Sequence, residues 1–77
     1  MKIVPRDGKT YDVKTASAKD DSYDVWLDGE LVASFVLEPD DTRVTLHARA
    51  AGKTSRAVIL EVAQEFVDRG GGAMRIA

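Results

Sequence analysis

The fold of this chain is decided by residues 22–37, which read SYDVWLDGELVASFVL. Two stretches rich in aromatic and β-branched residues flank the pair Asp28-Gly29. Such a pair is typical of a tight hairpin turn, because both residues tolerate the positive φ angles that the turn requires. Residues 22–27 and 30–37 are therefore predicted to form two antiparallel strands.

The length of this turn decides which side chains face the core, since a slip of one residue moves every side chain to the opposite face. A two-residue loop would place Trp26 beside Leu31 on one face. It would place Val25 beside Val32 on the other, which divides the apolar residues. A three-residue loop with a glycine bulge would instead gather one apolar face from Tyr23, Val25, Leu31, Ala33, Phe35 and Leu37. We adopt this second register, which predicts that Trp26, Val32 and Val36 point outward.

The flanking segments continue the pattern of short strands. Residues 5–8, Pro-Arg-Asp-Gly, are a turn signature between the apolar residues 3–4 and the alternating stretch 11–15, which predicts a first hairpin. After a loop at 16–21 and a turn at 38–41, residues 42–48 alternate cleanly. Val44, Leu46 and Ala48 fall on one face, and Arg43, Thr45 and His47 fall on the other. This alternation predicts a half-buried antiparallel strand.

From about residue 54 to residue 69 the apolar spacing becomes helical. The predicted inner side consists of Ile59, Val62, Ala63, Phe66 and Val67. Thr54 or Ser55 can cap the start, and glycines 70–72 end the helix. The apolar arc is wider than usual, so the helix is deeply seated or a partner covers its edge. Residues 73–77 are predicted to return as a short strand with Met74 and Ile76 inward.

Together these elements predict an α+β fold in which residues 1–77 form a single domain. An antiparallel β-meander of about five strands carries one helix on one face and a short C-terminal strand, in two layers around one core. In such a meander the loops before the third and fifth strands lie at the same end of the sheet.

The composition excludes several classes of protein. The chain has 77 residues, no cysteine and a net charge of −2. Absence of cysteine excludes disulfide scaffolds, thiolate zinc sites and cysteine nucleophiles, and it fits a reducing compartment, so we expect a cytoplasmic protein. The longest uncharged apolar run is too short to span a bilayer, and the first residues contain no apolar targeting segment, so no membrane association is expected.

The charges fall into two blocks along the chain. Eight acidic residues come before Arg43 without an intervening base: Asp20, Asp21, Asp24, Asp28, Glu30, Glu38, Asp40 and Asp41. Arg43, Arg49, Lys53 and Arg56 follow before the next acid at Glu61. The meander should sort these blocks toward opposite ends of the sheet, which predicts one acidic pole.

No motif indicates catalysis, a cofactor or a metal site. Residues 50–55, AAGKTS, resemble the tail of a phosphate-binding loop, but His47 stands where its first glycine would be. Residues 20–24 space carboxylates as calcium loops do, yet Val25 and Leu31 replace the required glycine and glutamate. His47 is the only histidine, and no serine lies in a nucleophile elbow. We therefore expect a protein that is not an enzyme and that holds no cofactor.

The sequence thus predicts a non-catalytic protein-binding module. It would be a small regulatory or inhibitory protein that occludes a surface of a larger protein or complex, as phage-type inhibitors do. The candidate binding residues are Trp26, Val32, Val36, Arg43 and Arg49 on the outward face, and Asp20, Asp21, Asp40 and Asp41 at the acidic pole. Tryptophan and exposed apolar strips are frequent in such interfaces.

Two alternatives stay open. The open sheet face could bind single-stranded nucleic acid, with Trp26 stacking a base and Arg43, His47 and Arg49 holding phosphates, although the net negative charge makes nucleic acid an unfavoured partner. The chain could also be a structural subunit that self-associates, as a homodimer, through an edge strand or through the wide apolar arc of the helix.

Overall fold

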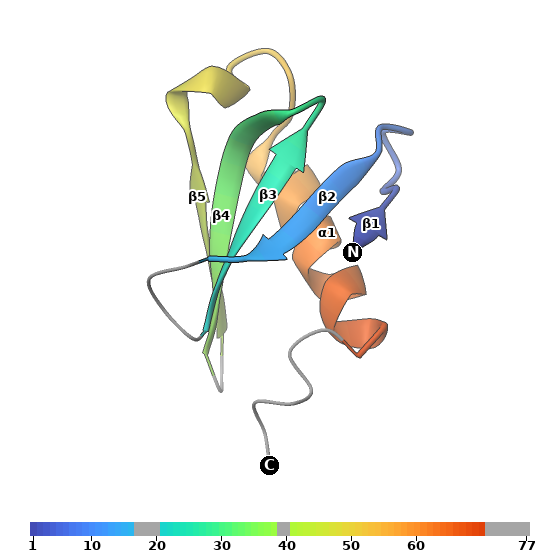
Figure 1. Cartoon of the computed structure of the whole chain (residues 1–77), viewed down its shortest axis with the longest axis vertical. Helices are drawn as coiled ribbons and strands as arrows, with labels where there is room; N and C mark the ends of the chain where they lie inside the picture. The colour runs from blue at the N-terminus through green and yellow to red at the C-terminus, as the bar shows by residue number, and fades with distance from the viewer. Residues whose placement is uncertain (17–20, 39–40, 71–77) are drawn as a thin grey trace.

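The computed structural model describes residues 1–16, 21–38 and 41–70. Five strands form one antiparallel sheet in the order β1-β2-β3-β4-β5, and α1 lies across one face of it (Figure 1). The elements are β1 (Lys2–Ile3), β2 (Tyr11–Thr15), β3 (Ser22–Leu27), β4 (Glu30–Glu38), β5 (Asp41–Leu46), the 3-10 helix η1 (Ala48–Ala50) and α1 (Arg56–Asp68). The predicted two-layer α+β meander is confirmed. The strand predicted at 73–77 with Met74 and Ile76, and glycines 71 and 72, lie outside the described residues.

The β3–β4 hairpin has the turn of the two-residue register, which was not the one adopted from the sequence, and beyond the first pairs it follows neither predicted register. Its loop has two residues, Asp28 and Gly29, with φ angles of 52° and 81°, and Trp26 pairs with Leu31. The register then shifts, so that Val25 pairs with Ala33 and Val32 is the extra residue of a β-bulge. The prediction of a glycine bulge in the turn is therefore wrong, because the bulge that the structure contains is at Val32, within β4.

This bulge corrects two predicted side-chain orientations. A bulge sets two residues of one strand against a single residue of the other, so consecutive side chains can face the same side. Val32 and Ala33 are both fully buried, with 0% exposure. The prediction that Val32 points outward is thus wrong. Leu31, predicted to be inward, pairs with Trp26 and is only half-buried.

The core lies between the sheet and α1. The rings of Tyr23, Phe35 and Phe66 form a triangle whose centroids are 5.4, 4.7 and 5.7 Å apart. Four of the five predicted inner residues of the helix are buried: Ile59, Val62, Ala63 and Phe66. Val67 is 44% exposed, so its predicted burial is wrong.

The helix begins and ends with local signals of the predicted kind. Ser55 is the N-cap, and its hydroxyl accepts a hydrogen bond from the Val58 amide at 3.3 Å. This bond satisfies one of the amides that the first turn leaves free. At the other end Gly70 has a φ of 89°, a conformation that glycine adopts without strain.

Both edges of the sheet are covered by an arginine of the helical segment. The Arg56 guanidinium donates to the carbonyl oxygen of Val44 in β5 at 2.9 Å. The Arg69 guanidinium donates to the carbonyl oxygen of Lys2 in β1 at 2.8 Å. Charged groups on edge strands oppose pairing with another chain. The helix thus runs from the β5 edge to the β1 edge and covers one carbonyl at each.

Candidate functional site

The face of the sheet away from α1, called here the open face, is covered by no described helix (Figure 1). The strand register and the alternation of side chains determine which residues it carries. They are Lys2 of β1, Asp12 and Lys14 of β2, Ser22, Asp24 and Trp26 of β3, Leu31, Ser34, Val36 and Glu38 of β4, and Asp41, Arg43 and Thr45 of β5. This face is the candidate site, because its side chains are not used to fill the core.

Four residues on β2 and β3 form a compact group, called here the Trp26 cluster: Asp12, Lys14, Asp24 and Trp26. Asp12 lies opposite Trp26, and Lys14 lies opposite Asp24. The Lys14 ammonium lies 5.5 Å from the centroid of the Trp26 ring and 3.8 Å from the Asp12 carboxylate. An ammonium at this distance from an indole face is attracted by its π electrons. The cluster therefore alternates acid, base and aromatic groups across two strands.

The predicted apolar strip is only partly assembled. Trp26 and Leu31 form a half-buried cross-strand pair. Val36 is also half-buried, but the row formed by Asp24 and Ser34 separates it from that pair. Val32 belongs to the core. Leu31 therefore lies beside Trp26 on the open face, where the prediction had placed Val32.

The predicted arginines lie far apart. Arg43 is on the open face, beside Val36 in the register, and its Nε donates to the Glu38 carboxylate at 2.7 Å. Arg49 is exposed in η1, which Figure 1 shows at the opposite end of the sheet from the start of β5. The structure therefore brings Arg43, but not Arg49, onto the face that carries Trp26.

Only part of the acidic block lies at one end of the sheet, because Asp28 and Glu30 are in or beside the β3–β4 turn at the opposite end, so the prediction that the block sorts to one acidic pole is wrong. β2 and β4 end, and β3 and β5 begin, at the same end of the sheet (Figure 1). Asp21 precedes β3, and Asp41 begins β5 opposite Glu38. Asp20 and Asp40, also predicted as binding residues, lie outside the described residues. The described acids border the open face, so the two surfaces that the sequence suggested are continuous.

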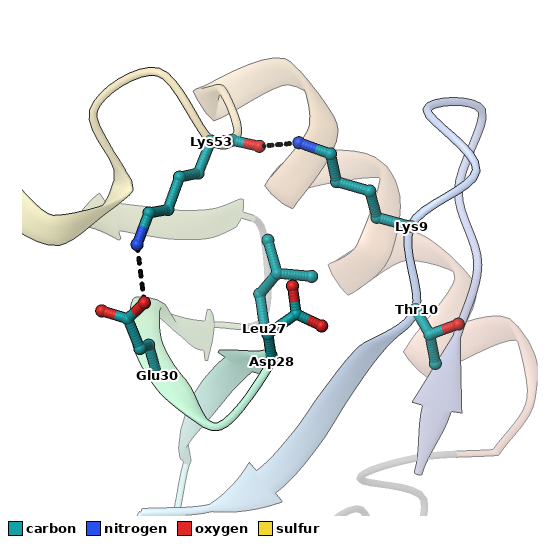
Figure 2. A pocket seen from close by; sticks show the side chains of 6 residues that line it. All are labelled: Lys9, Thr10, Leu27, Asp28, Glu30 and Lys53. Carbon is teal, nitrogen blue, oxygen red and sulfur yellow. Dashed lines mark hydrogen bonds and ion pairs between the residues drawn. The ribbon is translucent and has the colours of Figure 1, made fainter.

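A shallow pocket of about 350 Å³ lies at the other end and is lined by Lys9, Thr10, Leu27, Asp28, Glu30 and Lys53 (Figure 2). Lys53 Nζ lies 2.6 Å from Glu30 Oε1, and the Lys9 amine donates to the Lys53 carbonyl oxygen. The hydrogen bond from Lys53 holds the pKa of the Glu30 carboxyl below its usual value. An anion would have to displace contacts of both amines, so the segment that resembles a phosphate loop gains no support as a binding site.

His47 departs from its predicted strand position. β5 ends at Leu46, and His47 is the N-cap residue of η1, where its amide donates to the Val32 carbonyl oxygen at 2.9 Å. Its ring atom Nε2 is buried without a hydrogen-bond partner among the described residues. Within the described ranges no three His, Cys, Asp or Glu side chains are grouped as metal ligands would be.

Sequence reasoning missed Asp12, Lys14, Asp24 and Leu31 as members of the open face. The available signal was the alternation of residues 11–15, which places Asp12 and Lys14 opposite the core side of Tyr11 and Val13. Their alignment with Trp26 needs the register between β2 and β3, and no short turn signature fixes that register.

Comparisons with models of protein families, with curated proteins and with solved structures find no match for this chain. In the part of the chain that the structure describes, no helix is both long enough and apolar enough to cross a membrane. The open face is therefore interpreted from its own geometry and charges.

Proposed function

We propose that this chain is a non-catalytic protein-binding module whose open face occludes a surface of a larger partner. One observation carries the proposal: the Trp26–Leu31 pair lies on the sheet face that α1 leaves uncovered. Tryptophan side chains dominate the binding energy of many interfaces, especially where polar groups surround them. Here the charged residues Asp12, Lys14 and Asp24 of the Trp26 cluster provide that surround.

The charge of the open face favours a protein partner over a nucleic acid. Lys14 lies over the ring on which a base would have to stack. Asp12 lies opposite Trp26 in the register, and Asp24 lies two residues before it on the same face of β3, and carboxylates repel phosphates. Arg43 is engaged with Glu38. A regulatory or inhibitory role by occlusion is the proposed mode of action, because a chain of 77 residues can act by covering a surface without chemistry of its own.

The test is affinity capture from the source cell followed by a binding measurement on the purified partner. Trp26→Ala is expected to weaken binding at least about 30-fold, since truncating a central interface residue typically costs about 2 kcal/mol or more. Titration calorimetry gives the affinity, and NMR shift changes should map to β3 and β4.

Leu60→Ala is the matched control, because Leu60 is an exposed apolar residue of α1, on the other layer. It should leave the affinity unchanged. Equal affinities for the wild type and Trp26→Ala, with both proteins folded, would contradict the proposed function. Binding lost in Leu60→Ala alone would place the interface on the helix instead.

A further inference from the structure

The Trp26 cluster has the composition of a site for a cationic side chain. It joins an aromatic ring with two carboxylates, of which Asp12 lies opposite Trp26 in the β2–β3 register and Asp24 lies two residues before it on the same face of β3. Aromatic faces and carboxylates both attract cations, and together they desolvate and orient one. The chain itself supplies a cation there, since Lys14 Nζ lies 5.5 Å from the ring centroid.

Lys14 holds this position loosely. Its side chain is 61% exposed, and its contact with Asp12 measures 3.8 Å, at the outer limit of an ion pair. Asp12 also receives the Met1 amino group at 3.4 Å, whereas Asp24 makes no ion pair among the described residues. The cluster therefore keeps the Asp24 carboxylate without an ion pair among the described residues, on the same face as a ring that an exposed lysine partly covers.

We propose that the Trp26 cluster recognises an arginine side chain of the partner protein, and that Lys14 occupies the arginine position in the free chain. This inference rests on the proposed function and names the chemistry of its partner. A guanidinium fits the site better than an ammonium does, because it stacks flat on an indole and pairs with a carboxylate through two N–H groups. On binding, Lys14 swings away toward solvent, and the guanidinium lies between the Trp26 ring and Asp24.

The test uses a simple probe, acetyl-triarginine amide, with acetyl-tricitrulline amide as the neutral control of the same shape. Trp26 is the only tryptophan of the chain, so its fluorescence reports on this site alone. The arginine peptide should give a saturable change that weakens with salt, and the citrulline peptide should give none. Equal responses to the two peptides would overturn the inference.

Two variants test the individual parts. Lys14→Met removes the competing cation and should tighten the arginine peptide about two- to fivefold, the range of an exposed cation–π contact. Arg49→Met removes the same charge from exposed η1 and should change the affinity less. Asp24→Asn should weaken the peptide at least twofold, while Asp68→Asn, on α1, should not. Variants that match their controls would overturn the inference.

Binding of the natural partner separates this inference from the proposed function. If Trp26→Ala weakens the complex but Asp24→Asn equals Asp68→Asn, the binding module stands and arginine recognition is rejected. If the arginine peptide titrates as expected but Trp26→Ala leaves the partner's affinity unchanged, the cation site stands and the proposed function fails.

Discussion

The two faces of the sheet are built from alternate residues of the same strands, yet they differ in what holds them. On β3, Tyr23 and Val25 face α1 and are buried, whereas Asp24 and Trp26 face outward and are half-buried. The inner residues pack into one continuous core. The outer residues meet in pairs, through an ion pair and a cation–π contact. The residues that stabilise the fold and the residues proposed for binding therefore alternate along the same strand, so each set can be changed without changing the other.

The largest expected difference between the two faces is the loss of stability on truncation of a core residue, Phe35. Phe35 is 1% exposed and contacts the rings of Tyr23 and Phe66, so Phe35→Ala should lower the free energy of unfolding by about 3–5 kcal/mol. Trp26→Ala should lower it by about 1 kcal/mol or less. Urea unfolding followed by circular dichroism measures both.

A domain of this size can lose its fold with Phe35→Ala, so Phe35→Leu provides a second measurement. It keeps most of the side-chain volume and should cost less than Phe35→Ala while still exceeding the effect of Trp26→Ala. A Trp26→Ala loss as large as that of Phe35→Ala would show that the open face is part of the core.

The bulge offers an intermediate effect. Val32→Thr places a hydroxyl at a fully buried position and should cost about 1–3 kcal/mol, because the hydroxyl loses water without gaining a partner. Val36→Thr makes the same change on the open face and should stay within about 0.5 kcal/mol. Equal losses of stability in thermal or urea unfolding would argue for the register without a bulge.

The smallest expected effect comes from Tyr11, whose side chain is fully buried on the inner face. The Tyr11 hydroxyl donates to Asp7 at 2.6 Å and lies 2.9 Å from Thr54 Oγ1. Burial first, and then the bond to Asp7, raise the pKa of Tyr11 to about 12. An unfolded tyrosine ionises near pH 10, so this group stabilises the fold fully below pH 10. Its contribution is lost as the pH rises from about 10 to about 12.

Urea unfolding at a series of pH values from 9 to about 11 would detect this loss. Tyr11→Phe should be less stable at neutral pH by about 1 kcal/mol for the lost hydrogen bonds and should show a shallower decline above pH 10. If the free energy of unfolding declined with pH at the same slope in the wild type and in Tyr11→Phe, the decline would have to come from groups other than Tyr11.

The elements of the fold could be predicted because each carries a local signal. Asp28-Gly29 sets the central hairpin, and the 3.6-residue spacing of Ile59, Val62 and Phe66 identifies the helix. The bulge could not be predicted, since it depends on how Val32 packs into the core rather than on turn chemistry. The two-residue register was therefore right for the turn and for the Trp26–Leu31 pair, whereas the three-residue register was right only for the inward orientation of Tyr23, Val25, Ala33 and Phe35.

The exposure of Val67 has a similar origin. Arg56 contacts β5 and Arg69 contacts β1, so the helix crosses the sheet at a slant. A wide apolar arc on a slanted helix cannot be covered along its whole length by strands of this size, and Val67 is left exposed. The angle of crossing is a property of the packed layers, and no residue pattern within the helix encodes it.

The candidate site was predictable only in its centre. Trp26 was singled out from its position beside the hairpin turn, and the structure places it on the open face. Asp12 and Lys14 reach it across β2, and that alignment depends on strand pairing beyond a longer connection. The Trp26 cluster could therefore be identified only once the pairing of β2 with β3 was known.

The arginine contacts at the two ends of α1 have a consequence for the fate of the chain in a crowded cell. Because Arg56 covers β5 and Arg69 covers β1, undocking of this single helix would expose both strand edges together with the aromatic core. A molecule opened in this way could pair with another copy at each of its two edge strands, so the assembly could grow in two directions rather than stop at a dimer. Resistance to aggregation therefore rests on how rarely α1 detaches, and hydrogen exchange of its amides would report that frequency.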